Sequence, residues 1–315
     1  MDAPSWSRVT DSDVGGPVGS YRPPMRLLLS ALVLAMLPGT ALSSDFMWCV
    51  DATGTAPVFD CVPGLSCASD GGGSDEFTTV AAALSAARSV GGPSDAHHVC
   101  IETAGTHTEN IVVDNSDGAL GSSVDLYFNG EGNDYCPGGA GDAAVMFIGA
   151  PNQEPLNSYG VGSMAGDFAA CASSSDALFS VQDASLRLDG ARLSNFDGHL
   201  VNAVAGSESP SVQILGSRAE RFTGAMVVGD AGVSLDNSEI SGFTPPFGTP
   251  LIPGDASATQ FANLTYSALF GNVVLGAPLI KIPRGGRLGQ LTVAANIVVD
   301  YPNLLPRCFT ELEAV

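Results

Sequence analysis

The chain has 315 residues, enough for one or two domains with a sizeable core. Apolar residues make up 45% of it, which argues against a disordered chain, and the 38 glycines and 20 prolines favour many short strands joined by turns. The net charge of −21 argues against binding to nucleic acid, which needs clustered lysines and arginines, and against docking on anionic lipid.

Residues 1–43 are expected to be a leader and signal peptide. Met25-Arg26 precedes the apolar run 27–37, whose length suits the core of a signal peptide and is too short to cross a bilayer. The basic start at Met25 is a better beginning for such a peptide than the polar stretch before it. We therefore expect Met25 to be the true start, with no membrane span in the mature chain.

Residues 44–74 are expected to form an irregular cysteine-containing segment. The chain has seven cysteines, which fits export to an oxidising compartment and leaves at least one thiol without an intramolecular partner. Their spacing matches no familiar zinc site. The sequence leaves the pairing open among Cys49, Cys61, Cys67, Cys100, Cys136, Cys171 and Cys308.

The next segment predicts one helix followed by short strands. Small and apolar residues recur at helical spacing over 77–90, before a Gly-Gly-Pro stop. Alternating apolar runs bounded by turn residues predict strands at 98–103, 109–114, 124–128 and 145–148. The stretch 151–175 is expected to be a loop.

Three blocks then align without a gap, at offsets of 26 and 21 residues. They are SLRLDGARLSNFDG from Ser185, SVQILGSRAERFTG from Ser211 and GVSLDNSEISGFTP from Gly232. Repeats of this length are typical of solenoids, in which strands of successive repeats pair and inward side chains stack. The matching apolar sites are Leu186/Val212/Val233, Leu188/Ile214/Leu235 and Leu193/Ala219/Ile240, with a bend at Gly190/Gly216/Asn237 and a closing Phe196/Phe222/Phe243.

Further apolar residues extend this pattern. An apolar couplet precedes each block, and a similar one stands at Leu279-Ile280. A fourth copy is predicted in QLTVAANIVVDYP, with Leu291, Val293, Val298 and Tyr301 in the same columns and Ala295 at the bend. An antiparallel β-sandwich with chance similarity is the alternative, which repetition in register disfavours.

These residues resemble the pectate-lyase-like superfamily of right-handed parallel β-helices. FTTVAAALSAA followed by VCIETAGTHTENIVV is similar to the capping helix and first coil, and ANLTYSALFGN to the coil consensus of bacterial surface β-helix proteins. The resemblance implies an all-β fold: a right-handed parallel β-helix (solenoid) over 75–315 with a short N-terminal capping helix. Little chain follows the fourth block for a C-terminal cap, so we expect a truncated C-terminus.

Enzymes of this superfamily act on polysaccharides along an outer groove, with clustered carboxylates, an arginine or lysine base, or calcium. The predicted outward columns place Asp189 and Asp236 on either side of Leu215, about 10 Å apart at the usual strand spacing. That distance is near the upper end for inverting glycosidases. The candidate catalytic residues are therefore Asp189, Asp236, Arg192, Arg218 and Glu239, although an ordinary solvated face explains them equally well.

Other candidate residues favour plain structural interpretations. His107 and His199 are expected to be surface or turn histidines. The run 114–118 (DNSDG) resembles a calcium loop but lacks the later bidentate glutamate, so a turn rich in Asx residues is the better interpretation. No cofactor is predicted, and calcium is the one metal for which the sequence offers a partial motif.

We expect a non-enzymatic exported protein, secreted, periplasmic or at the cell surface, that presents a repetitive face to polysaccharides or surface partners. The alternatives are a polysaccharide lyase or glycoside hydrolase of the same superfamily, or a fragment of a longer adhesin. Outward residues on adjacent coils would distinguish them: three or more carboxylates with an arginine or lysine favour an enzyme.

Export predicts a new N-terminus. Cleavage after Ala41 or Ser43 fits the preference of signal peptidase for small residues. Mass spectrometry of the exported protein should therefore find a chain that begins at Leu42 or Ser44, and a mature chain that begins at Met1 would contradict this assignment.

Overall fold

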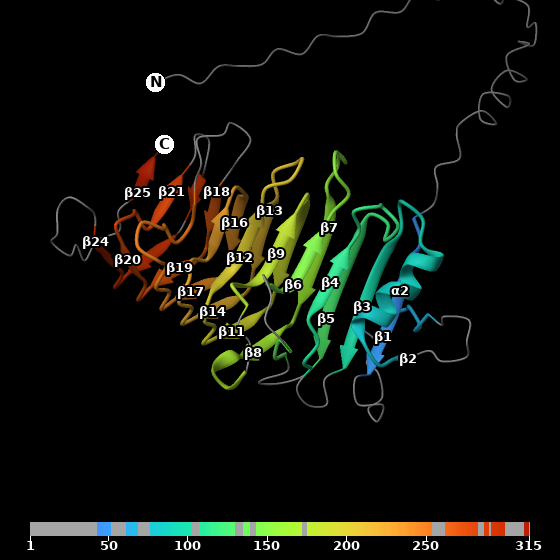
Figure 1. The fold of residues 1–315 in the computed structure, drawn as a ribbon. Coiled ribbons are helices and arrows are strands. Elements are labelled where there is room, and N and C mark those ends of the chain that lie inside the picture. Colours follow the sequence, from blue (N-terminus) through green and yellow to red (C-terminus); the bar gives the residue numbers. More distant parts are fainter. Residues whose placement is uncertain are drawn as a thin grey trace, which may run out of the picture. The chain divides into compact units, whose positions relative to one another are not determined.

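A computed structural model describes residues 43–51, 61–68, 76–102, 107–129, 135–138, 143–171, 175–253, 262–282, 287–289, 291–299 and 312–314. All of them belong to one compact unit that begins at Ser43. This unit is rich in strands, and every pairing between its described strands is parallel. The strands lie side by side from β1 at one end of the unit to β21 near the other (Figure 1).

Three sheets hold most of the strands. The ten-stranded sheet has the order β2 (Glu76–Phe77), β1 (Asp45–Asp51), β3 (Ala96–Glu102), β5 (Ser123–Asn129), β7 (Asn157–Gly162), β10 (Ala184–Asp189), β13 (Ser211–Leu215), β16 (Gly232–Asp236), β18 (Ala262–Thr265) and β22 (Arg287–Gly289). The six-stranded sheet runs β23 (Thr292–Ala294), β19 (Ala268–Phe270), β17 (Glu239–Ser241), β14 (Arg218–Glu220), β11 (Arg192–Ser194) and β8 (Ala165–Asp167).

The five-stranded sheet runs β15 (Val227–Gly229), β12 (His199–Val204), β9 (Ala177–Gln182), β6 (Ala143–Ile148) and β4 (Ile111–Asp114). Two pairs complete the described strands: β20 (Val273–Leu275) with β24 (Ile297–Val299), and β21 (Ile280–Ile282) with β25 (Leu312–Ala314). From β7 to β17, successive strands belong in turn to the ten-, six- and five-stranded sheets, and this order repeats. Stacked parallel sheets of this kind are compatible with a β-helix.

The helix α2 (Val80–Val90) lies at the β1 end of the unit, as the spacing of apolar residues predicts. Its buried residues recur at helical spacing and contact the first strands: Val80, Ala83, Leu84 and Ala87. The Thr79 hydroxyl accepts a hydrogen bond from the Ala82 N–H, and the Glu109 carboxylate accepts from the Val80 and Ala81 N–H groups at 2.7 and 2.8 Å. A carboxylate at this helix end satisfies free N–H groups and complements the helix dipole.

The repeat register predicted from the three blocks is confirmed. Leu186, Val212 and Val233 are direct partners on neighbouring strands, and the other two columns pair in the same way (Leu188/Ile214/Leu235 and Leu193/Ala219/Ile240). All nine side chains are buried. The phenylalanines stack as predicted, with ring centroids 5.6 Å apart for Phe196–Phe222 and 4.8 Å for Phe222–Phe243.

The predicted bends are also confirmed. Gly190, Gly216 and Asn237 have positive φ angles of 66°, 55° and 47°, a conformation that glycine and asparagine adopt most easily. A buried residue follows each bend. The hydroxyl of Ser217 accepts a hydrogen bond from the Ala191 N–H, and that of Ser238 accepts from the Ser217 N–H. Each bend is thereby bonded to its neighbour.

The prediction that 151–175 is a loop is wrong, because this stretch contains β7, β8 and the short 3-10 helix η1 (Phe168–Ala170). Two outward glycines hid β7 from pattern analysis, since glycine is rare in strands. An alanine in place of Gly160 would collide with Asp125, and one in place of Gly162 would lie 2.8 Å from the Tyr127 ring. Side chains of the neighbouring strand β5 therefore occupy the space that a Cβ atom would take at both glycines.

The predicted fourth copy is also out of register. Val293 pairs with Leu269, the partner of Ile240, so it continues the column of Leu193 and not that of Leu188. The column of Leu188 continues instead through Leu264, which pairs with Leu235. The true copy carries Tyr266 at its bend, with a φ of 47°. A tyrosine at a positive-φ bend is unusual. The block lies in ANLTYSALFGN, which resembles the coil consensus but was not aligned with the three repeats.

Three disulfides join the described cysteines: Cys49–Cys67, Cys61–Cys100 and Cys136–Cys171. The first two tie segment 61–68 to β1 and β3 at the α2 end. Such bonds are typical of an oxidising, extracellular environment. Cys308 lies outside the described residues.

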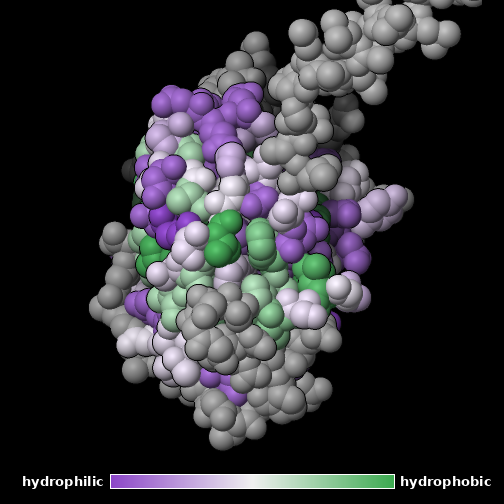
Figure 2. Space-filling view, turned by 90° about the vertical axis from the view of Figure 1, so that its right-hand side faces the viewer, coloured by the Kyte–Doolittle hydropathy of each residue, from purple (hydrophilic) through white to green (hydrophobic). Residues whose placement is uncertain are grey.

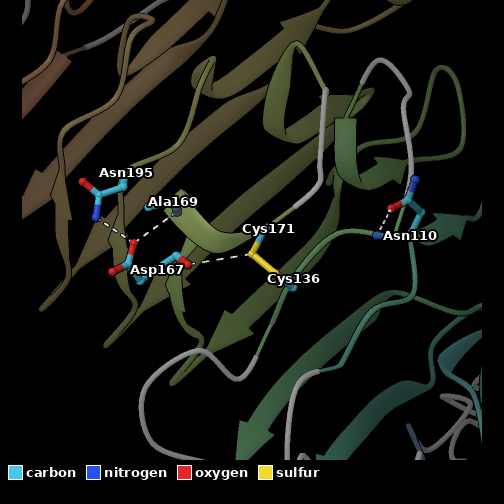
Figure 3. The surroundings of a disulfide bond; sticks show 7 residues. Asn110, Cys136, Asp167, Ala169, Cys171 and Asn195 are labelled. Atoms are coloured by element: carbon cyan, nitrogen blue, oxygen red, sulfur yellow. Dashed lines mark hydrogen bonds between the residues drawn. A yellow bond between two sulfur atoms is a disulfide. The ribbon is translucent and has the colours of Figure 1, made fainter.

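The third disulfide connects segment 135–138 to the residue that follows η1 (Figure 3). Beside it, Asp167 Oδ1 accepts hydrogen bonds from the Ala169 N–H at 3.2 Å and from the Asn195 side-chain amide at 2.6 Å. Asn195 in turn accepts from Arg221 Nε at 2.5 Å. Polar side chains therefore bond across three successive repeats at this corner.

Figure 2 shows the α2 end of the unit, where apolar residues lie among hydrophilic ones. Among the described residues, no helix is long and apolar enough to cross a membrane. The expected signal-peptide run 27–37 lies outside them.

The core register makes a mutational prediction. Ile214→Asp would place a carboxylate between Leu188 and Leu235 without a partner, which should cost several kcal/mol and unfold a marginally stable domain. Gln213→Asp changes the neighbouring outward position and should alter the stability by less than about 1 kcal/mol. Urea unfolding measures the stability of both variants, and equal unfolding midpoints would contradict the register of Ile214 between Leu188 and Leu235.

A second prediction concerns pH. The Trp48 Nε1–H donates to Nδ1 of the buried His97 at 3.0 Å, which requires a neutral imidazole. Burial lowers the pKa of His97 below its ordinary value of 6.5; the charge of Asp95 opposes this shift and that of His98 adds to it. Because the unfolded chain protonates first, the stability that His97 contributes is present above pH 6.5 and is lost as the pH falls below it.

Urea midpoints at pH 7, 6 and 5 should therefore decline for the wild type. His97→Gln keeps an acceptor for Trp48 but cannot be protonated, so its decline over the same range should be smaller. Identical declines for the two proteins would show that His97 does not cause the pH dependence.

Candidate functional site

Two adjoining cavities form a groove beside the five-stranded sheet, which we call the β9–β12 groove. Their volumes are about 530 and 420 Å³, and both are lined by Asp176 and Asn202. The larger cavity is also lined by Asp197, His199 and Thr223. The second lies over outward residues of the sheet: Met146, Ile148, Ser180, Gln182, Asn202 and Val204.

The repeat places the residues of the larger cavity side by side. Asp176 directly precedes β9 and Asp197-Gly198 precedes β12, whose first residue pairs with that of β9. A Cβ atom on Gly198 would lie 2.6 Å from the Asp176 carbonyl oxygen. Glycine is therefore needed at this position to let the two connections approach closely.

Hydrogen bonds hold two of these side chains in place. Asp197 Oδ1 accepts from the Thr223 hydroxyl at 2.6 Å, across one repeat. His199 Nδ1 accepts from the Ala225 N–H at 2.9 Å, which leaves the ring proton on Nε2. Burial lowers the pKa of His199, with the charge of Asp176 opposing the shift, so the imidazole is neutral at pH 7.

The groove can both accept and donate hydrogen bonds. The carboxylates of Asp176 and Asp197 accept, while His199 Nε2–H and the Asn202 amide donate. Val228 and Pro246 add apolar surface to the larger cavity. No lysine or arginine is among the described residues that line either cavity. This chemistry suits a neutral molecule that carries several hydroxyl groups.

The residues predicted as catalytic lie elsewhere. Asp189 and Asp236 are on the ten-stranded sheet with Leu215 between them, in the predicted column. Asp236 accepts a hydrogen bond from the Thr265 hydroxyl at 2.7 Å, whereas Asp189 lines a different cavity, over β7.

The other three candidates are on the six-stranded sheet. Arg192, Arg218 and Glu239 are neighbours in one column, as predicted. Arg218 forms ion pairs with Glu239 at 3.1 Å and with Glu220 at 2.9 Å. An exposed arginine between two carboxylates is typical of a solvated face.

The two candidate histidines, His107 and His199, lie in different surroundings. His107 was expected to be a surface or turn residue, but it is buried against the Phe128 and Tyr135 rings, 3.5 Å from the Glu109 carboxylate. His199 lines the groove. Sequence reasoning did not select Asp197, although a signal was present. Asp197-Gly198 and Thr223-Gly224 both follow a stacked phenylalanine, which marks a repeated polar column.

The segment 114–118 is a turn, as predicted. Asp114 Oδ1 accepts from the Ser116 N–H at 2.9 Å, and Asp117 Oδ1 accepts from the Ala119 N–H at 3.0 Å. These side chains cap the backbone in the manner of Asx turns. Within the described residues, no group of three or more His, Cys, Asp or Glu is placed to hold a metal ion.

Comparison of the chain with protein-family models, curated proteins and solved structures finds no match.

Proposed function

We propose that this chain is an exported, right-handed parallel β-helix protein that binds a neutral polysaccharide along the β9–β12 groove without cleaving it. The repeated visiting order of the three sheets supports the β-helix. The right hand follows from the strong preference of parallel crossovers for that hand. The three disulfides and the apolar run 27–37 support export.

One observation carries the proposal for a polymer. Asp176 and Asn202 line both cavities, so the groove continues over neighbouring strands and is not a closed pocket. Neighbouring strands lie about 4.8 Å apart. Successive sugar units can therefore meet hydrogen-bonding groups on successive strands, and weak contacts add along the polymer.

Charge favours a neutral polymer over an acidic one. Two carboxylates line the larger cavity, and the whole chain carries a net charge of −21. A uronate or sulfate group would be repelled there, because no described cation of the groove offsets the carboxylates. The described lining also lacks the arginine or lysine base that a uronate lyase needs, which disfavours a lyase.

The test is binding to a panel of neutral and uronate-containing glycans, with and without calcium. Asp197→Asn should weaken binding to a neutral glycan about tenfold or more, since hydrogen bonds to a charged group are worth about 1.5–3 kcal/mol. Asp236→Asn is the matched control, with the same chemistry on the ten-stranded sheet, and should bind like the wild type. Isothermal titration calorimetry measures both.

Product analysis on the same samples separates binding from catalysis. New reducing ends or unsaturated uronate absorbance that vanish in an Asp176→Asn/Asp197→Asn variant would replace this proposal with a hydrolase or lyase. Equal binding by the Asp197→Asn and wild-type proteins would remove the groove from the binding site.

A further inference from the structure

A third cavity, separate from the two of the β9–β12 groove, lies on the ten-stranded sheet over the glycine-rich strand β7. Its volume is about 280 Å³, and its floor includes the outward positions of Gly160 and Gly162. Gly160 pairs with Asp125 on one side and Arg187 on the other, while Gly162 pairs with Tyr127 and Asp189. Two walls of polar side chains therefore face each other across a strand that has no side chains there.

The spacing of the strands sets the width of this β7 cavity. Its walls stand on β5 and β10, two strand spacings or about 10 Å apart. The Asp125 carboxylate and the Tyr127 ring lean over the glycines, because each occupies the space where a Cβ atom would be. A ligand would thus lie between an acidic, aromatic wall and a wall with one cation and one carboxylate.

The polar groups of the second wall are available to a ligand. Arg187 and Asp189 are exposed, and no side-chain hydrogen bond or ion pair joins either of them to another described residue. On the opposite wall, the His98 ring contacts Tyr127 at 6.1 Å between centroids, and His98 Nδ1 lies 3.4 Å from the Asp125 carboxylate. His98 thereby supports both side chains of that wall.

The Tyr127 hydroxyl stays protonated at neutral pH. Burial raises its pKa above 10, and the carboxylates of Asp125 and Asp189 raise it further against the opposing charge of Arg187. The ring therefore offers a neutral hydroxyl and an aromatic face, which attracts cations.

We propose that the β7 cavity binds a free basic α-amino acid. The Arg187 guanidinium binds the carboxylate of the amino acid, and the Asp189 carboxylate binds its α-ammonium group. Both side chains stand on the same wall. The aliphatic stem lies between the two walls, and the side-chain cation meets Asp125 and the Tyr127 ring. This inference goes beyond glycan binding and is independent of it, since the β9–β12 groove involves none of these residues.

Charge and size select this class of ligand. One arginine against two aspartates gives the described lining a net negative charge, so an occupant with two cations and one anion complements it. The volume is slightly below the roughly 300–1,000 Å³ of pockets for drug-sized ligands, so the occupant is small. A simple anion would meet Arg187 but face two carboxylates.

Titration of the whole mature protein with L-lysine tests the proposal. Calorimetry or NMR shifts should detect binding at millimolar or lower concentration. L-Norleucine lacks the side-chain cation and L-lysinamide lacks the carboxylate, so both should bind at least about tenfold more weakly. Arg187→Gln should weaken L-lysine binding by a similar factor. Arg192→Gln, an exposed arginine on the six-stranded sheet, is the matched control and should leave it unchanged.

The Asp125→Asn variant tests the orientation of L-lysine in the β7 cavity. It should weaken the binding of L-lysine but not that of L-norleucine, because only lysine has a cation for this wall. No binding of L-lysine by the wild type, equal binding of L-norleucine, or unchanged binding by Arg187→Gln would each overturn the proposal. These outcomes would not bear on the proposal of glycan binding, so the two proposals can be refuted independently.

Discussion

The register between successive repeats is the constraint on which the rest of this structure depends. A side-chain period of two residues in a strand means that a slip of one residue would turn every inward leucine outward. The bends prevent this. A residue at positive φ, such as Gly216, turns the chain, and the buried serine that follows it accepts an N–H from the previous repeat. The backbone bond and the apolar columns therefore specify the same alignment.

A fixed register also determines the outer surface, because each outward position becomes a column across neighbouring strands. Where a column carries charged side chains on every strand, they pair with one another, as Arg218 does with Glu239 of the next strand. Where glycine interrupts a column, a cavity opens. Gly160 and Gly162 do this on the ten-stranded sheet, and Gly198 allows the close approach that forms the β9–β12 groove.

The sequence predicted the part of the fold in which side chains are large and repeat. Leu188, Ile214 and Leu235 are found in one column because burial demands apolar residues there on every repeat. Pattern analysis failed where function or geometry replaced the repeated residue. The glycines of β7 made a strand look like a loop, and the fourth copy was placed out of register at Val293. Asp197 was missed for a related reason: its column carries Thr223 in the next repeat, so the residue type changes from repeat to repeat and an apolar pattern does not mark it.

The two cavities differ in charge chemistry although they are built on the same repeat. The β9–β12 groove has carboxylates and a neutral histidine, so the proposed ligand selection there rests on the pattern of hydroxyl groups. The β7 cavity contains Arg187, one of only 12 lysines and arginines in the chain, and this cation lacks a described ion-pair partner. An unpaired arginine beside two aspartates is complementary to a dipolar molecule and not to a neutral sugar. Under the two proposals, one scaffold would offer an extended site for a polymer on one sheet and a compact site for a small charged ligand on another.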